Sequence, residues 1–185
     1  MARLARWLDI FFQVVTLALL VSLTVVVLLG VGFRYSGRSL IWYDEVASML
    51  LAWITFAGAG LATLRNAHLG FSGLLFGLPR PARTALFVLV ELLFVLTFLV
   101  IGWAGWAILE IFAGETLISV RFVTRSFVQS ILPIGAGLIV LSRLLTLPQR
   151  WRDVQEGQDP ETQEIREEIA RAEQELQGIR LETPR

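Results

Sequence analysis

The sequence predicts an all-α integral membrane protein with four transmembrane helices, a short interfacial segment and a polar C-terminal tail. Of the 185 residues, 55% are apolar and only 17% are charged, whereas soluble domains carry about 25% charged residues. The mean hydropathy is +0.66. Four stretches supply the roughly 20 apolar residues that a helix needs to cross the hydrocarbon core of a bilayer. A polytopic membrane protein is therefore the predicted class.

The four transmembrane helices are predicted at residues 10–33, 45–64, 85–109 and 127–147. The first contains no acidic or basic residue before Arg34, the third is interrupted by Glu91, and the fourth contains Pro133. The first segment is not predicted to be a signal peptide, because its apolar run is too long. Residues 1–152 are accordingly predicted to form a four-helix membrane domain.

The distribution of arginines predicts that both termini are cytoplasmic. Arginines gather at the N-terminus, in the loop between the second and third spans, and after the fourth span (Arg3, Arg6, Arg65, Arg80, Arg83, Arg143, Arg150 and Arg152). The other two loops carry only Arg34, Arg38, Arg121 and Arg125. Because loops rich in arginine and lysine stay in the cytoplasm, the first and third loops should face the opposite side.

Two polar or short segments lie outside the four spans. The apolar run at residues 69–78 is too short to span and is predicted to be interfacial. Residues 153–185 are predicted to be a cytoplasmic tail with an amphipathic helix at about 160–180, which begins at Asp159 and Pro160. Apolar residues recur in that helix at spacings of three and four (Ile165, Ile169, Ala172, Leu176 and Ile179). This favours a solvated tail helix, with a partner-binding or self-associating helix as the alternative.

Several functional classes are not supported by the composition. The chain has no cysteine, which excludes disulfides and thiolate chemistry, and its formal net charge of zero does not suggest a nucleic-acid binder. The GFSG stretch at 70–73 resembles the nucleophile motif of an intramembrane serine protease, but no histidine follows it as a base. The one histidine, His68, is predicted to lie at the cytoplasmic interface or to contact a partner. We therefore expect no enzyme, no catalytic residue and no bound cofactor or metal.

Glu91 is a carboxylate within the third apolar span. An ionised carboxylate at the centre of a membrane helix costs roughly 2.5–3.5 kcal/mol, so Glu91 should face protein. Arg143 on the fourth span lies at a similar depth, and its long side chain makes it the expected partner, alongside a polar group of another subunit. The alternative is a proton-binding site of a small exporter.

Four charges flank the turn between the first two spans: Arg34, Arg38, Asp44 and Glu45. The acidic pair opens the second span, where carboxylates face the positive end of the helix dipole. A charge-assisted bond from Arg34 or Arg38 to one of these carboxylates would close the hairpin, and we predict an ion pair or hydrogen bond from Arg34. Trp42 fits an interfacial aromatic belt.

The second span carries a face of small residues that is suited to helix packing. Its members are Ser48, Ala52, Thr55, Ala59 and Ala62, with Gly58 beside them. Small side chains let another helix approach closely, which favours association in a bilayer. Trp53, on another face, is a second candidate contact. The pattern leaves open whether each packs within the chain or against another subunit.

The order of these features resembles the small membrane subunit, DctQ-like, of tripartite ATP-independent periplasmic (TRAP) transporters. The matching pieces are Phe33-Arg34-Tyr35, Trp42, Asp44-Glu45, the run Trp53–Ala59 with Phe56, Gly58 and Ala59, Arg65, and His68-Leu69-Gly70. The resemblance covers about residues 10–150. Asp44 departs from the family pattern, which usually has glutamate at that position.

The resemblance implies a non-enzymatic subunit that braces a large DctM-like membrane subunit. That large subunit would carry the sodium and substrate sites, and a periplasmic binding protein would deliver an organic acid to it without ATP. The expected location is the cytoplasmic, or inner, membrane of a bacterium or archaeon, in contact with lipid. A stand-alone proton-coupled exporter using Glu91 and an unrelated four-helix membrane scaffold are the alternatives.

Overall fold

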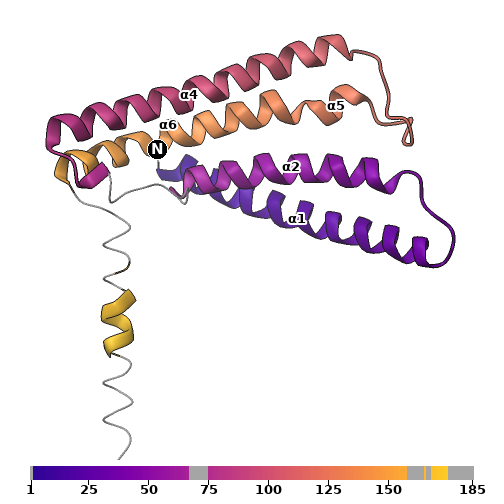
Figure 1. Ribbon diagram of the computed structural model, residues 1–185, viewed down its shortest axis with the longest axis horizontal. Coiled ribbons are helices and arrows are strands. Elements are labelled where there is room, and N and C mark those ends of the chain that lie inside the picture. Colours follow the sequence, from indigo (N-terminus) through magenta and orange to yellow (C-terminus); the bar gives the residue numbers. More distant parts are fainter. Residues whose placement is uncertain (1, 67–74, 158–164, 166–167, 175–185) are drawn as a thin grey trace, which may run out of the picture. The chain divides into compact units, whose positions relative to one another are not determined.

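The computed structural model describes residues 2–66, 75–157, 165 and 168–174, and its secondary structure is helical (Figure 1). The helices are α1 (Ala2–Tyr35), α2 (Tyr43–Leu64), α4 (Arg80–Ile111), α5 (Arg125–Gln129) and α6 (Ile131–Glu156). Four stretches are long and apolar enough to cross a membrane: Arg3–Tyr35, Tyr43–Leu64, Arg80–Ile111 and Arg125–Glu156. The predicted all-helical fold with four spans is confirmed.

The helices are longer than the predicted spans. At about 1.5 Å per residue, the 34 residues of α1 extend roughly 50 Å, which exceeds the roughly 30 Å of hydrocarbon. The 32 residues of α4 are similar in length. Backbone hydrogen bonding therefore continues beyond the apolar stretch at the ends of these helices, where charged residues such as Arg6 and Arg80 are placed.

Each long helix is followed by a residue in the left-handed region. The positive φ angles are 77° at Gly37, 52° at Asn66, 89° at Gly114 and 73° at Gly157. Such a residue turns the chain away from the helix axis and lets the last carbonyls accept bonds from the turn. At the end of α6, for example, the Gly157 amide donates to the Asp153 carbonyl at 2.9 Å. Local sequence thus sets where the helices stop.

The fourth span differs from the single helix predicted at 127–147. It consists of the short α5 and of α6, with a junction at Ser130. Pro133 supplies a reason, because it has no N–H to donate to the carbonyl of Gln129. Helix α6 then continues through Pro148 to Glu156, past Arg152, where the polar tail was predicted to begin.

The chain divides into two compact units. Unit 1 comprises Met1–His68 and Leu92–Leu147, and unit 2 comprises Leu69–Glu91 and Pro148–Arg185. Within unit 1, helices approach one another where a ring or bulky side chain lies against a glycine. These contacts are Tyr43 at Gly30, Phe12 at Gly60, Phe56 at Gly135, and Leu132 with Pro133 at Gly105. Close packing of this kind is what holds helices together in lipid, where apolar burial contributes little.

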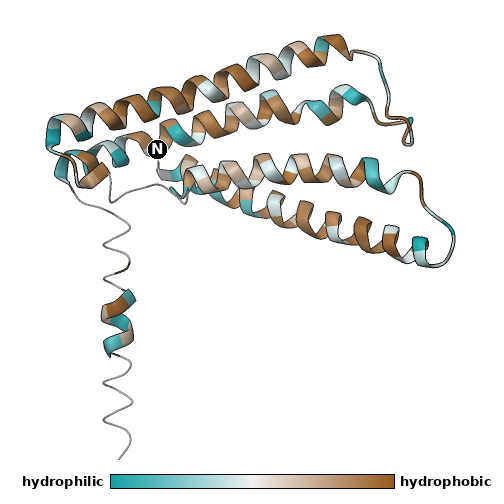
Figure 2. Cartoon of the chain, in the orientation of Figure 1, coloured by the Kyte–Doolittle hydropathy of each residue, from teal (hydrophilic) through white to brown (hydrophobic). Residues whose placement is uncertain are grey.

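Much of the apolar surface of α1 and α4 is not covered by the chain itself. Only 6% of the apolar window of the first span and 11% of that of the third are buried, compared with 33% of the fourth. Figure 2 shows these helices as largely hydrophobic along their length. Their surfaces are thus available to lipid or to another membrane protein.

Two predicted segments lie wholly or partly outside the described residues. For the interfacial segment at 69–78, only residues 75–78 are described, and residues 75 and 76 are helical. In the tail, residues 165 and 168–174 are helical. The amphipathic character of a helix over 160–180, and its cytoplasmic location, remain predictions.

Candidate functional site

The turn between α1 and α2 lies beside the loop that joins α4 to α5, and Glu45 links the two. Its carboxylate accepts the backbone N–H groups of Ile118 at 3.1 Å and of Ser119 at 2.8 Å. The Ser119 hydroxyl donates to the carbonyl of Ile41 at 3.4 Å. A hydrogen bond from an amide to an ionised carboxylate is stronger than one between two neutral groups, and Glu45 accepts two such bonds. Glu45 therefore anchors the α4–α5 loop to the start of α2.

The α4–α5 loop is also ordered by its own contacts. The Arg125 guanidinium pairs with the Glu115 carboxylate at 2.9 Å, and its backbone N–H donates to the Glu115 carbonyl at the same distance. Thr116 and Thr124 form an antiparallel β-bridge, and Leu117 is buried. These contacts hold the two amides that bind Glu45 in position.

The ion pair predicted between Arg34 and Asp44 or Glu45 is wrong. Within the described residues, no carboxylate lies within 4.0 Å of the Arg34 guanidinium. Glu45 is engaged by the loop amides instead, and both Arg34 and Asp44 are exposed. Tyr35 is 90% exposed. The hairpin is closed by a distant loop and not by the charges nearest in sequence.

Trp53 packs within the chain. Its indole ring stacks on Phe127 with centroids 5.5 Å apart, and its Nε1 donates to the Val128 carbonyl at 3.2 Å. Trp53 is partly buried, and an indole N–H that is withdrawn from water needs such an acceptor. Trp53 therefore attaches α2 to α5. The sequence left open whether this residue packs within the chain or against another subunit, and the structure shows that it packs within the chain. Trp42, beside the α2 N-terminus, is only partly buried.

The small-residue face of α2, with Ser48, Ala52, Thr55, Ala59 and Ala62 and with Gly58 beside them, is at least partly uncovered. Ser48 and Thr55 are exposed, and the other four are partly buried. The Ser48 and Thr55 hydroxyls donate to the backbone carbonyls four residues earlier, at 2.8 and 2.7 Å, so neither hydroxyl lacks a bond. A Cβ added at Gly58 would meet no atom within 4 Å. The face thus has small side chains and hydrogen-bonded hydroxyls, and it leaves room for an approaching helix.

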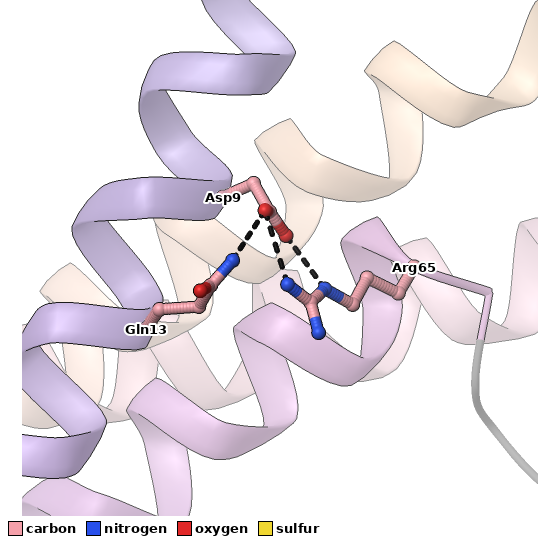
Figure 3. Close-up of polar contacts among 3 residues, drawn as sticks. All are labelled: Asp9, Gln13 and Arg65. Carbon is pink, nitrogen blue, oxygen red and sulfur yellow. Dashed lines mark hydrogen bonds and ion pairs between the residues drawn. The ribbon is translucent and has the colours of Figure 1, made fainter.

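At the opposite end of α2, Arg65 is bound by Asp9 of α1 (Figure 3). The guanidinium donates to the two carboxylate oxygens at 2.7 and 3.1 Å, and Gln13 donates to the same carboxylate at 2.5 Å. Hydrogen bonding to Asp9 raises the pKa of Arg65 above its already high ordinary value, so Arg65 stays charged. This bidentate contact joins the start of α1 to the end of α2. His68, predicted nearby, lies outside the described residues.

In unit 2, Glu91 is buried with 8% of its surface exposed, and it forms an ion pair with Arg150. The Arg150 guanidinium also lies 5.4 Å from the centroid of Phe87, whose ring contacts Trp151. The prediction that Glu91 faces protein is confirmed. Arg150 was not anticipated as a partner, because α6 was expected to end at Leu147.

Arg143, the partner expected for Glu91 from the sequence, is itself buried in unit 1. Only 6% of its surface is exposed, and its guanidinium lies 4.4 Å from the centroid of the Phe94 ring. A cation over an aromatic face is stabilised by the ring quadrupole, the more so when it is shielded from water.

The sequence model of the DctQ component of tripartite ATP-independent periplasmic transporters matches residues 23–153. The chain belongs to the DctQ family. It is therefore a multi-pass membrane protein and the small membrane component of a TRAP transporter. No curated protein matches it.

The family match covers the residues that form most of the described contacts. Glu45, Trp53 and the Glu91–Arg150 pair all lie within residues 23–153, whereas Asp9 precedes the match. Within the described residues of this DctQ chain, no group of three histidine or acidic side chains gathers as a metal site. The contacts among the described residues attach helices and loops to one another.

Sequence reasoning missed the residues that complete each contact. Asp9 could have been noticed as an acidic residue at the start of a long apolar helix. Arg150 could have been found by extending α6 through Pro148. The amides of Ile118 and Ser119 carry no side-chain signal, since any residue supplies a backbone N–H.

One prediction concerns the anchoring of the α4–α5 loop by Glu45. We expect Glu45→Gln to increase hydrogen exchange at the amides of Ile118 and Ser119, because a neutral amide oxygen accepts these bonds more weakly than a carboxylate. Asp44→Asn is the matched control, since Asp44 is exposed and is not bonded to the loop. Equal exchange in the two variants would mean that the Glu45 charge does not hold the loop.

Proposed function

We propose that this DctQ subunit braces a large, DctM-like membrane subunit during sodium-driven uptake of an organic acid that a periplasmic binding protein delivers. The sodium and substrate sites belong to the large subunit, and this chain binds no cofactor. The assembly resides in the cytoplasmic membrane of a bacterium or archaeon. Membership of the DctQ family supports the class of transporter. The arginine distribution supports cytoplasmic termini.

The observation that carries the bracing role is the small-residue face of α2. The chain uses Trp53, Phe56 and Gly60 of this helix for its own packing, yet it leaves Gly58 open and Thr55 exposed. Leucine and isoleucine pack as favourably against lipid as against another helix. A face of glycine, alanine and hydroxyl residues is therefore useful chiefly where another helix approaches closely.

Uptake into proteoliposomes tests this proposal. We expect uptake when both membrane subunits, the binding protein and an inward sodium gradient are present, and loss of uptake when this chain or the gradient is omitted. ATP should have no effect. Uptake by the large subunit alone at the full rate would contradict the bracing role, and uptake by this chain alone would favour the small-exporter alternative.

The proposed orientation can be tested by single-cysteine labelling. The native chain has no cysteine, so each introduced thiol is unique. Phe122 is 90% exposed in the α4–α5 loop, and Glu156 is exposed at the end of α6. We expect a membrane-impermeant maleimide to label Phe122→Cys in cells with a permeabilised outer membrane, and Glu156→Cys only after the inner membrane is opened. The reverse pattern would invert the topology.

A further inference from the structure

The N-terminal end of α4, in unit 2, holds a buried positive charge that lacks a counterion in the described part of the chain. Arg83 is 7% exposed, and its Nε has no hydrogen-bond partner among the described residues. No carboxylate there lies within 4.0 Å of its guanidinium. Removing such a charge from water is energetically unfavourable unless an anion or hydrogen bonds compensate. The position therefore calls for an anionic partner.

The Arg83 guanidinium points back toward the start of α4. It lies 5.8 Å from the ring centroid of Phe76, which precedes the helix, in keeping with the direction that helical side chains take. Its Nη1 is 2.8 Å from the position that a Cβ on Gly157 would occupy, so Gly157 leaves room for the guanidinium. The charge thus lies near the helix end, beside an aromatic ring and next to a glycine.

A second arginine lies on the same end of α4. Arg80 is one turn before Arg83, and its Nη2 donates to the carbonyl of Gln155 at 3.1 Å. That single bond leaves most of the five donors of the guanidinium available. The N-terminus of this 32-residue helix adds the positive end of the helix dipole, although Pro81 has no N–H and the Arg83 N–H is bonded to the Pro79 carbonyl. Two guanidinium groups and a helix N-terminus together favour an anion with several oxygens.

We propose that this end of α4, built from Arg80 and Arg83, binds a phosphate group. A phospholipid headgroup is one source and free inorganic phosphate is another. Because α4 is one of the membrane-spanning helices, its N-terminus lies at a bilayer surface, where headgroup phosphates are concentrated. This inference needs only the membrane location of α4 and is independent of the proposed bracing role.

Thermal unfolding of the full-length chain in an uncharged detergent tests the proposal. We expect phosphatidylglycerol to raise Tm and diacylglycerol with the same acyl chains, which lacks phosphate, to leave it unchanged. Arg83→Gln should weaken phosphatidylglycerol binding about tenfold or more, as expected when a bond to a charged group is lost. Arg152→Gln, which removes an exposed arginine of the same unit, is the matched control and should bind like the parent.

Two further measurements complete the experiment. One identifies the source of the phosphate, and the other uses a second variant in case the first does not fold. A stabilising effect of inorganic phosphate equal to that of the lipid would identify a soluble anion as the source, and no effect would identify the lipid. If Arg83→Gln does not fold, Arg80→Gln should show the same direction of change. Equal lipid binding by the parent and Arg80→Gln, or equal stabilisation by diacylglycerol, would overturn the proposal.

An intramolecular counterion is the competing explanation, because Asp159 and Glu161 follow Gly157 in the sequence. The double variant Asp159→Asn/Glu161→Gln separates the two. We expect it to keep the full phosphatidylglycerol response of the parent. If it instead loses as much stability as Arg83→Gln, and the parent shows no lipid response, the acidic tail is the counterion and the phosphate site does not exist.

Discussion

Replacing Gly58 by leucine is expected to separate this subunit from the large membrane subunit while leaving its own fold intact. A Cβ added at Gly58 meets no atom within 4 Å, so the start of a side chain has space in the isolated subunit. At a close helix–helix contact the added carbons would cost about 1–3 kcal/mol, which lowers the association constant about tenfold or more. Detergent co-purification of the two membrane subunits measures this, and uptake should fall in parallel.

Gly60 provides the matched control for this experiment, since it lies two residues away on the buried side of α2. A Cβ at Gly60 would approach the Phe12 ring to 2.6 Å, and Phe12 is 1% exposed. Gly60→Leu should therefore lower the Tm of the isolated subunit, whereas Gly58→Leu should not. If Gly58→Leu co-purifies and supports uptake like the parent, the small-residue face is in contact with lipid and the bracing proposal must rest on another surface.

Ala52 and Ala59 also belong to the small-residue face and, like Gly58, are partly buried, but free space for added atoms is established only at Gly58. A bulky residue at either position would disturb the subunit and the complex together. Gly58 and the exposed Thr55 are consequently the more informative sites, and Thr55→Leu should weaken co-purification in the same direction as Gly58→Leu.

The second large effect is expected at the Glu91–Arg150 ion pair. The side chains of these residues are only 11% and 22% exposed. Glu91→Leu removes the carboxylate and leaves the Arg150 charge shielded from water, which should destabilise the subunit by about 3–5 kcal/mol. The measurement is the loss of Tm in detergent, with helix content followed by circular dichroism.

The double variant Glu91→Leu/Arg150→Leu distinguishes a stabilising pair from two independent contributions. Replacing a buried ion pair by apolar residues of similar volume is often close to neutral, so the double variant should recover most of the stability that Glu91→Leu loses. Additive losses would show that the two side chains act separately. A parent-like Tm for Glu91→Leu would show that the pair contributes little, whatever its burial.

The sequence by itself determined the class of protein, the number of spans and the approximate position of each helix. The physical reason is that a bilayer demands about 20 consecutive apolar residues per helix, a constraint that one chain satisfies or fails without reference to its neighbours. The left-handed residues that follow α1, α2 and α4, which are Gly37, Asn66 and Gly114, were not predicted and were found only in the structure. The order of motifs from Arg34 to His68 was enough to indicate the family.

Only the tertiary structure decided which partners these residues have. Arg34 and Glu45 are close in sequence and opposite in charge, yet Glu45 binds two amides more than 70 positions away. Arg150 reaches Glu91 because α6 continues through Pro148, which a span length does not reveal. Side-chain spacing reports the face of a helix, but the neighbour of that face depends on how distant segments pack. For that reason Trp53 and Gly58, five residues apart on α2, have different roles: one binds this chain, and the other is left open.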